Sequence, residues 1–287
     1  MNPDEILLHD SIFLIGKTHK VCQDYAISGT IVNELGDIIT YAIVSDGCSG
    51  SPDSDIGARI LAQSAKLHLC DTYGRMSLQL IVDKKIEFYN FGSSIISRAK
   101  AIANALYLNS NCLDATLVLA FVFRDHIIIY MYGDGVIIAQ DNNNSISYIQ
   151  RTYLSGAPYY LSYWLDANRR MMYQKEFDNK VIINEQNAEK VEYDSEGTIA
   201  EYLTIKSLKE TKSILIGSDG LSTFIKQGND PLSLIDVSNN VTSFKNTTGE
   251  FLKRRVLKYT DDCRKAGIYH YDDIALAGFV KGGIVEK

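Results

Sequence analysis

The sequence predicts an α+β fold in which two antiparallel β-sheets pack face to face and α-helices cover their outer faces. Apolar, β-branched runs of strand length occur in groups, and very short turns separate many neighbours, which favours antiparallel pairing. The helical segments lie between these groups and do not alternate with single strands, which argues against a doubly wound parallel sheet. We therefore expect a four-layer αββα sandwich.

Strands are predicted where β-branched and aromatic residues dominate an apolar run. These runs cover residues 26–34, 38–45, 115–123, 126–132, 136–140, 213–218 and 274–280. Gly133-Asp134-Gly135 lies between two of them and is typical of a type I′ hairpin turn, so we interpret it as a structural turn.

Helices are predicted where apolar residues recur at helical spacing. These segments cover residues 56–69, 93–108 and part of 246–266. Gly92 and Ser93 are expected to open the second helix, and Thr247 or Thr248 to cap the third.

The chain has 287 residues and no internal repeat or proline-rich linker, so one domain over residues 1–287 is the simplest organisation. The stretch at about 151–210 is the least regular and is predicted to be a flap-like insertion. It contains a cluster of aromatic residues, for which we expect a local aromatic core, with substrate contact as the alternative. The cluster consists of Tyr153, Tyr159, Tyr160, Tyr163 and Trp164.

Charge and cysteine content narrow the functional classes. A formal net charge of −6 argues against broad binding to nucleic acid or to anionic membranes. The five cysteines have no CxxC spacing, which argues against a disulfide framework or a zinc knuckle. The longest apolar run, at 115–123, is about half of what crossing a bilayer requires. We expect a monomeric cytoplasmic protein without a nucleic-acid or membrane partner.

Two segments of the chain nearly repeat each other, YAIVSDGCS at 41–49 and ILIGSDGLS at 214–222. In each, an apolar strand ends in an aspartate, Asp46 or Asp219, followed by glycine. The pair Asp272 and Asp273 precedes the last predicted strand. Carboxylates at the ends of buried strands are costly unless they are solvated, paired or bound to a cation, and Mg²⁺ and Mn²⁺ prefer such oxygen ligands. The pattern leaves open whether these strand ends meet.

Six motifs in order, from about Gly16 to Val280, resemble the type 2C family of metal-dependent serine/threonine protein phosphatases, in the form found in bacteria. They are CQDYA at 22–26, IVSDGCSG at 43–50, DATLVLAF at 114–121, YMYGDGVII at 130–138, ILIGSDGLSTF at 214–224 and YDDIALAGF at 271–279. The family's fold, two packed antiparallel sheets flanked by helices, agrees with the element order above.

The resemblance implies a role for each matching residue. Asp46 would bridge two Mn²⁺ or Mg²⁺ ions, and the Gly47 carbonyl would bind the second. Asp219 and Asp272 would complete the first ion's ligands, and Asp24 would hold water molecules around the metals. A metal-activated water would then hydrolyse phosphoserine or phosphothreonine in a protein substrate, which fits a role in signalling.

The chain departs from the family pattern at several positions. His19, followed by Lys20, stands where the family has a phosphate-binding arginine, and Cys48 stands where many members have histidine or methionine. Asp114 replaces a glycine, either as a ligand of a weak third metal or as a polar residue at the start of a strand. Asp273 replaces an asparagine and is an additional candidate ligand.

These departures favour a second hypothesis, a phosphatase-fold binding or regulatory module with weakened catalysis. A third, a two-metal nuclease, fits the carboxylates but conflicts with the acidic charge.

Overall fold

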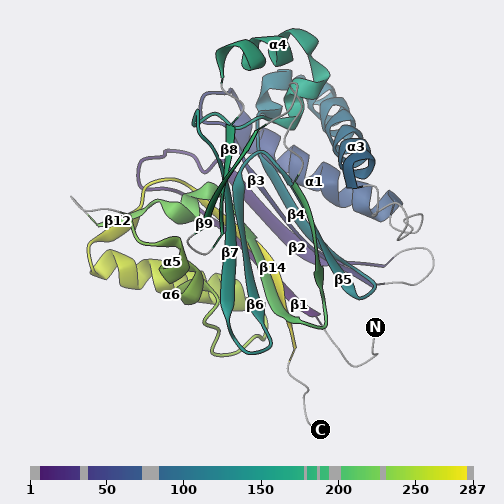
Figure 1. Ribbon diagram of the computed structural model, residues 1–287. Helices are drawn as coiled ribbons and strands as arrows, with labels where there is room; N and C mark the ends of the chain where they lie inside the picture. The colour runs from purple at the N-terminus through teal and green to yellow at the C-terminus, as the bar shows by residue number, and fades with distance from the viewer. Residues whose placement is uncertain are drawn as a thin grey trace.

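The computed structural model describes residues 7–32, 38–72, 84–177, 180–185, 188–193, 202–226 and 231–282. Two large antiparallel sheets pack against each other and helices cover both outer faces (Figure 1), so the predicted α+β sandwich is confirmed.

The larger sheet has seven strands, and each pairs antiparallel with its neighbours. In order across the sheet they are β1 (Leu7–Leu14), β14 (Ile274–Lys281), β11 (Thr211–Gly217), β6 (Gly135–Asp141), β7 (Ile146–Tyr153), β8 (Lys180–Glu185) and β9 (Ala188–Tyr193).

The second sheet has five strands, again antiparallel throughout. In order they are β10 (Tyr202–Ser207), β5 (His126–Tyr132), β4 (Leu117–Phe123), β3 (Ile38–Asp46) and β2 (Asp24–Val32). A separate two-stranded ribbon joins β12 (Phe224–Lys226) to β13 (Ile268–His270).

Helices lie on both outer faces. Helices α1 (Ser54–Thr72) and α3 (Lys84–Ala105) cover the five-stranded sheet, and α5 (Leu234–Val241) and α6 (Phe251–Lys265) cover the seven-stranded sheet (Figure 1). A further helix, α4 (Ala167–Glu176), lies beyond the end of β7. Short 3₁₀ turns occur at η2 (Ser110–Leu113), η3 (Leu161–Leu165) and η4 (Asp219–Ser222).

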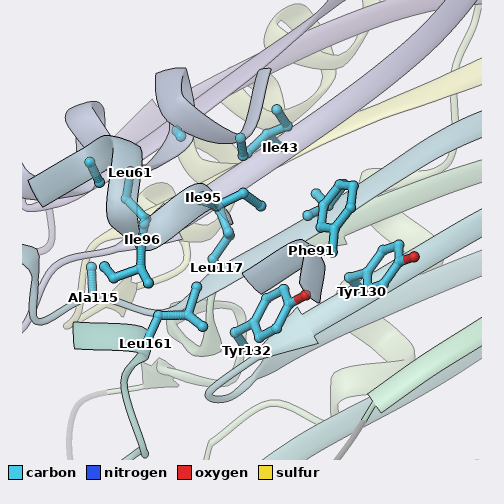
Figure 2. Close-up of a cluster of buried hydrophobic side chains, with 14 of the residues drawn as sticks. Ile43, Leu61, Phe91, Ile95, Ile96, Ala115, Leu117, Tyr130, Tyr132 and Leu161 are labelled. Atoms are coloured by element: carbon cyan, nitrogen blue, oxygen red, sulfur yellow. The ribbon is translucent and has the colours of Figure 1, made fainter. Parts of the chain in front are cut away.

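Three buried clusters fill the three spaces between these four layers. One lies between the five-stranded sheet and α1 and α3, where Ile43 packs near Leu61 and Ile95 (Figure 2). The second lies between the sheets, and includes Val44 from the opposite face of β3. The third lies under α5 and α6. A strand buried on both faces reads as a continuous apolar run, which explains the unbroken pattern at 38–45.

Each predicted strand is present to within two or three residues, and helices occupy the three predicted segments with different bounds. Three expectations at the ends of elements are wrong. Gly92 lies inside α3, which begins at Lys84, and the residue preceding α6 is Glu250, not Thr247 or Thr248. The segment 133–135 is not a hairpin, because β5 and β6 belong to different sheets and do not pair.

The stretch at 151–210 is more regular in its described part than expected. It contains η3, α4 and the strands β8, β9 and β10, although residues 178–179, 186–187 and 194–201 lie outside the described residues. Its aromatic residues form the expected local core: Tyr159 is buried, and its ring lies 5.2 Å from that of Tyr163 and 5.0 Å from that of Tyr173.

Candidate active site

Two aspartates face each other at one end of the five-stranded sheet. Asp24 begins β2, Asp46 ends β3, and the strand register places them directly opposite. Like charges in this position are unfavourable unless something neutralises them. The carboxyls of Asp24 and Asp46 are close enough to act on each other's pKa. Oδ2 of Asp24 is buried and has no hydrogen-bond donor in the part of the chain that the structure describes.

The residue after Asp46 is a glycine for a geometric reason. A Cβ on Gly47 would lie 2.6 Å from the carbonyl oxygen of Ser54 and 2.9 Å from that of Gln23. Its N–H donates to the Gln23 carbonyl at 3.2 Å. The chain therefore turns tightly beside Asp46, between β2 and the start of α1.

The seven-stranded sheet brings Asp219 to the same place. Asp219 follows β11, and its carboxyl interacts with that of Asp46. A Cβ on Gly220 would lie 1.7 Å from the carbonyl oxygen of Asp273. This close approach holds the turn after β11 against the start of β14, so that Asp272 acts electrostatically on Asp219.

Asp134 also joins this group, although the sequence suggested a purely structural turn. It lies where the chain crosses from β5 in one sheet to β6 in the other, and its side chain is buried. It interacts electrostatically with Asp46 and Asp219. Buried Arg151, whose position in β7 is opposite Gly135, is the positive charge that acts on it.

Burial and mutual repulsion raise the pKa values of these four carboxyls. Burial is the largest cause in each case. It raises the pKa of Asp24 to about 7, with further contributions from the charges of Asp219 and Asp273. The pKa of Asp46 is raised by burial and by its three carboxylate neighbours. That of Asp134 rises with burial and the Asp219 charge, and that of Asp219 with burial and the Asp272 charge.

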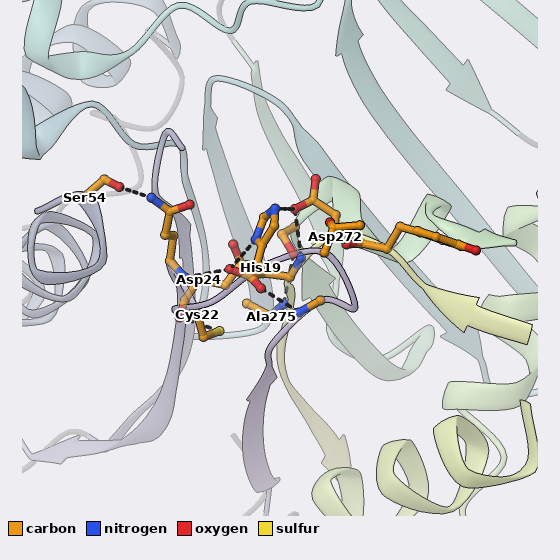
Figure 3. Close-up of polar contacts among 12 residues, drawn as sticks. His19, Cys22, Asp24, Ser54, Asp272 and Ala275 are labelled. Atoms are coloured by element: carbon orange, nitrogen blue, oxygen red, sulfur yellow. Dashed lines mark hydrogen bonds and ion pairs between the residues drawn. The ribbon is translucent and has the colours of Figure 1, made fainter. Parts of the chain in front are cut away.

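His19 lies between the two aspartates that precede β14 (Figure 3). Its Nδ1 is 3.1 Å from Oδ2 of Asp273, and its Nε2 is 3.4 Å from Oδ1 of Asp272. Partial burial lowers the pKa of His19, but the neighbouring carboxylates, chiefly Asp273, outweigh it and raise the pKa overall. The imidazole therefore favours its charged form, beside the carboxylates.

Asp273 fastens the loop that carries His19. Its Oδ1 accepts a hydrogen bond from the N–H of Gly16 at 2.7 Å, and its Oδ2 accepts one from that of Gln23 at 2.6 Å. Asp273 is buried, whereas Lys20, on the same loop, is exposed. The two departures from the family pattern at 19 and 273 are thus in contact.

Asp114 is engaged elsewhere. Its carboxylate accepts hydrogen bonds from Ser51 at 2.8 Å, from Ser162 at 2.6 Å and from Arg169 at 2.7 Å. None of the four clustered carboxyls is among these partners, so Asp114 connects the loop after Asp46 to the η3–α4 segment.

The donor set fits a hard divalent cation in its chemistry. The four carboxyls and the Gly47 carbonyl supply only oxygen atoms. Oδ2 of Asp24 is buried and accepts no hydrogen bond within the described residues, and a cation could satisfy such an oxygen. Within the described residues, no three acidic, histidine or cysteine side chains adopt a ready-made coordination geometry. Burial and mutual repulsion favour the protonated forms of these carboxyls, and a bound cation would favour their ionised forms.

The structure is similar to the serine/threonine phosphatase Stp1 from Staphylococcus aureus, with 14% identity, coverage of 97% of this chain and 96% of that chain, and a TM-score of 0.52. It is also similar to the catalytic domain of the phosphatase PstP, solved in complex with two manganese ions (14% identity, coverage 97% and 100%, TM-score 0.54). The S. agalactiae serine/threonine phosphatase shares 16% identity, with coverage of 96% and 99% and a TM-score of 0.54.

The fold is thus that of the serine/threonine phosphatases. The family model for protein phosphatase 2C matches residues 16–257, so the chain belongs to the protein phosphatase 2C family. The last motif of the resemblance, at 271–279, lies beyond the matched range. Among curated proteins, none matches the sequence significantly. No helix among the described residues is long and apolar enough to cross a membrane, and all five cysteines are free.

Proposed function

We propose that this protein hydrolyses phosphoserine and phosphothreonine in protein substrates at the cluster of carboxylates between its two sheets. The observation that carries the proposal is the convergence of Asp24, Asp46, Asp134 and Asp219 from separate strand ends. Four acidic groups in one buried place destabilise the fold unless cations offset their charge, so their presence indicates a function.

Asp46, the Gly47 carbonyl, Asp219 and Asp272 are the residues we assign to two Mn²⁺ or Mg²⁺ ions, with Asp24 holding water molecules around them. When bound, such ions supply an acidified water as nucleophile and positive charge for the phosphoryl oxygens. Asp134 and its partner Arg151 lie against the same group and adjust its charge. Asp114 and Asp273 are left out of this assignment, because other partners already occupy their oxygens.

His19 and Lys20 are the cationic groups that we assign to the phosphate of the substrate. The Asp273 carboxylate positions the imidazole and favours its charged form, and the Lys20 side chain is exposed on the same loop. Neither side chain offers the two parallel donors of a guanidinium, so this grip on phosphate is weaker than that of an arginine.

A second candidate function is a binding or regulatory module with weak catalysis. The contact of His19 with two carboxylates favours it, because Asp272 and Asp273 offset much of the charge that would bind phosphate. Calorimetry separates the two candidates: Mn²⁺ binding without turnover supports the module, and turnover excludes it.

The cellular setting belongs to the same proposal. We assign a monomeric, cytoplasmic signalling enzyme formed as one domain, with phosphorylated proteins as its partners and no affinity for nucleic acid or membranes. The free cysteines and the net charge of −6 support this assignment.

A direct test uses purified protein with Mn²⁺ and a phosphothreonine peptide. Release of phosphate by the wild type, and its loss in Asp24→Asn and Asp219→Asn, is the expected result. If the wild type releases no phosphate from the peptide or from p-nitrophenyl phosphate, the proposed reaction is wrong.

A further inference from the structure

We propose that Asp114 is a positioning residue that fastens the segment from Ala157 to Glu176, here called the flap, to the rim of the carboxylate site. This inference rests on the proposed phosphatase function, in which a protein substrate must lie across that rim. In the family resemblance described above, Asp114 stands where the family has glycine.

The contacts of Asp114 come from two sides. On one side, Ser51 donates to its carboxylate and the N–H of Cys48 donates to its backbone carbonyl at 2.8 Å. Both residues belong to the loop that follows Asp46 and Gly47. On the other side, Ser162 of η3 and Arg169 of α4 donate to the same carboxylate. One buried side chain thus joins the site loop to the flap.

The hydrogen bond between Asp114 and Ser162 is buried at both ends. Asp114 is 4% exposed and Ser162 is 1% exposed, so neither can replace this partner with water. The guanidinium of Arg169 lies 4.8 Å from the centre of the Tyr163 ring, which limits its freedom. Charge-assisted hydrogen bonds are stronger than neutral ones, so the contact of Arg169 with Asp114 holds α4 in one orientation.

The flap is also held by apolar packing, through residues on either side of Tyr163. Leu161 is fully buried in the cluster beneath α3 (Figure 2). The Trp164 ring lies 5.3 Å from that of Tyr89 and 6.2 Å from that of Tyr132. A Cβ on Gly92 would lie 2.8 Å from Trp164, so the absent side chain makes room for the indole. These contacts anchor η3, while Asp114 orients α4 beyond it.

The position of the flap matters because it carries Tyr160 to the site. Tyr160 is buried, and burial together with the neighbouring Cys48 thiol raises the pKa of its hydroxyl. The charges of Asp134 and Asp46 act on it as well. A phenol hydroxyl is a hydrogen-bond donor, so at this place it can donate to a bound phosphorylated residue. Asp114 acts on the reaction only through the flap.

The test has a readout that does not depend on activity. Trp164 is the only tryptophan in the chain, so its fluorescence reports the seating of the flap. In Asp114→Ala and Arg169→Met, we expect more quenching of Trp164 by acrylamide and faster hydrogen exchange over residues 157–176. Arg170→Met is the matched control, because Arg170 is exposed and has no ion pair within the described residues.

Activity then separates positioning from general damage. With both loosened variants, kcat/KM for a phosphothreonine peptide should fall about tenfold, as expected for misplaced substrate contacts. The value for p-nitrophenyl phosphate, which is too small to span the rim, should fall by less than about twofold. Arg169→Lys, which keeps the charge, should retain part of the peptide activity.

The outcomes are distinct. Wild-type quenching and exchange in Asp114→Ala overturn the fastening role of Asp114, whatever the activity. A loosened flap with unchanged peptide turnover overturns its link to substrate binding. Absence of any turnover in the wild type counts against the phosphatase proposal, while the fluorescence result still decides whether Asp114 holds the flap.

Discussion

Replacing Asp24 with asparagine should stabilise the metal-free protein at alkaline pH. In the fold, burial raises the pKa of Asp24 from its ordinary value of 3.8 to about 7. This difference is equivalent to about 4 kcal/mol of stability lost once the group is ionised. Because the charges of neighbouring carboxylates contribute to this shift as well as burial, we expect Asp24→Asn to recover about 2–4 kcal/mol above pH 7.

The sign follows from proton binding. Between pH 3.8 and about 7 the folded protein holds a proton on Asp24 that the unfolded chain has lost. The free energy of unfolding of the wild type therefore falls as the pH rises through this window. Asparagine does not titrate, so the advantage of the variant grows over the same window. Its amide can donate a hydrogen bond to the Asp46 carboxylate.

The assay is urea denaturation in EDTA at pH 4 and pH 8, for the wild type, Asp24→Asn and the exposed control Asp53→Asn. The variant should gain stability at pH 8 relative to pH 4, and the control should not. Equal or lower stability of Asp24→Asn at pH 8 would refute the reasoning, since a buried carboxylate without a cation must then cost nothing.

Three further outcomes follow from named contacts. Gly220→Ala should lose at least about 2 kcal/mol of stability and much of its Mn²⁺ affinity, because its Cβ would overlap the Asp273 carbonyl oxygen. Gly50→Ala is the control for denaturation and calorimetry, because a Cβ on Gly50 would have its nearest neighbour at 3.8 Å. Equal losses in the Gly220 and Gly50 variants would contradict this explanation. His68 packs edge-on against Phe91, and burial lowers the pKa of His68 to about 4. Between pH 4 and 6.5 the unfolded chain binds more protons than the folded protein, so acidification through this window costs the wild type about 1–3 kcal/mol of stability. This loss should be smaller in His68→Leu, which urea denaturation at pH 4.5 and 7.5 will measure. His19→Arg should lower KM for a phosphothreonine peptide about three- to tenfold through a bidentate grip, and an unchanged KM in steady-state kinetics would argue against a phosphate contact at this position.

Much of the fold could be predicted because strands that are buried on both faces appear in the sequence as continuous apolar runs. The strand β1 was not predicted, because three polar residues interrupt its apolar residues and only Leu7 and Ile12 are buried. The helix α3 was predicted too short because Gly92 resembles a boundary. It is tolerated inside the helix because Trp164, more than 70 positions away, packs over it.

The site was only partly predictable for a similar reason. The two Ser-Asp-Gly segments marked Asp46 and Asp219, since an aspartate at the end of an apolar strand is visible in the sequence. Asp134 carries the same local signal, but hairpin chemistry explains Gly-Asp-Gly equally well until the sheet order shows that β5 and β6 do not pair. The contacts of Asp114 with Ser162 and Arg169 span about 50 residues, a distance over which periodicity carries no information.

The central claim is that Asp46 joins the two sheets into one metal-dependent catalytic site. Its most direct test is Mn²⁺ calorimetry and phosphothreonine-peptide hydrolysis, measured in parallel on the wild type, Asp46→Asn and the neighbouring control Cys48→Ala. We predict that the wild type and Cys48→Ala bind Mn²⁺ and release phosphate, whereas Asp46→Asn does neither. Hydrolysis by Asp46→Asn at the wild-type rate, or none by the wild type with Mn²⁺ bound, would contradict the account.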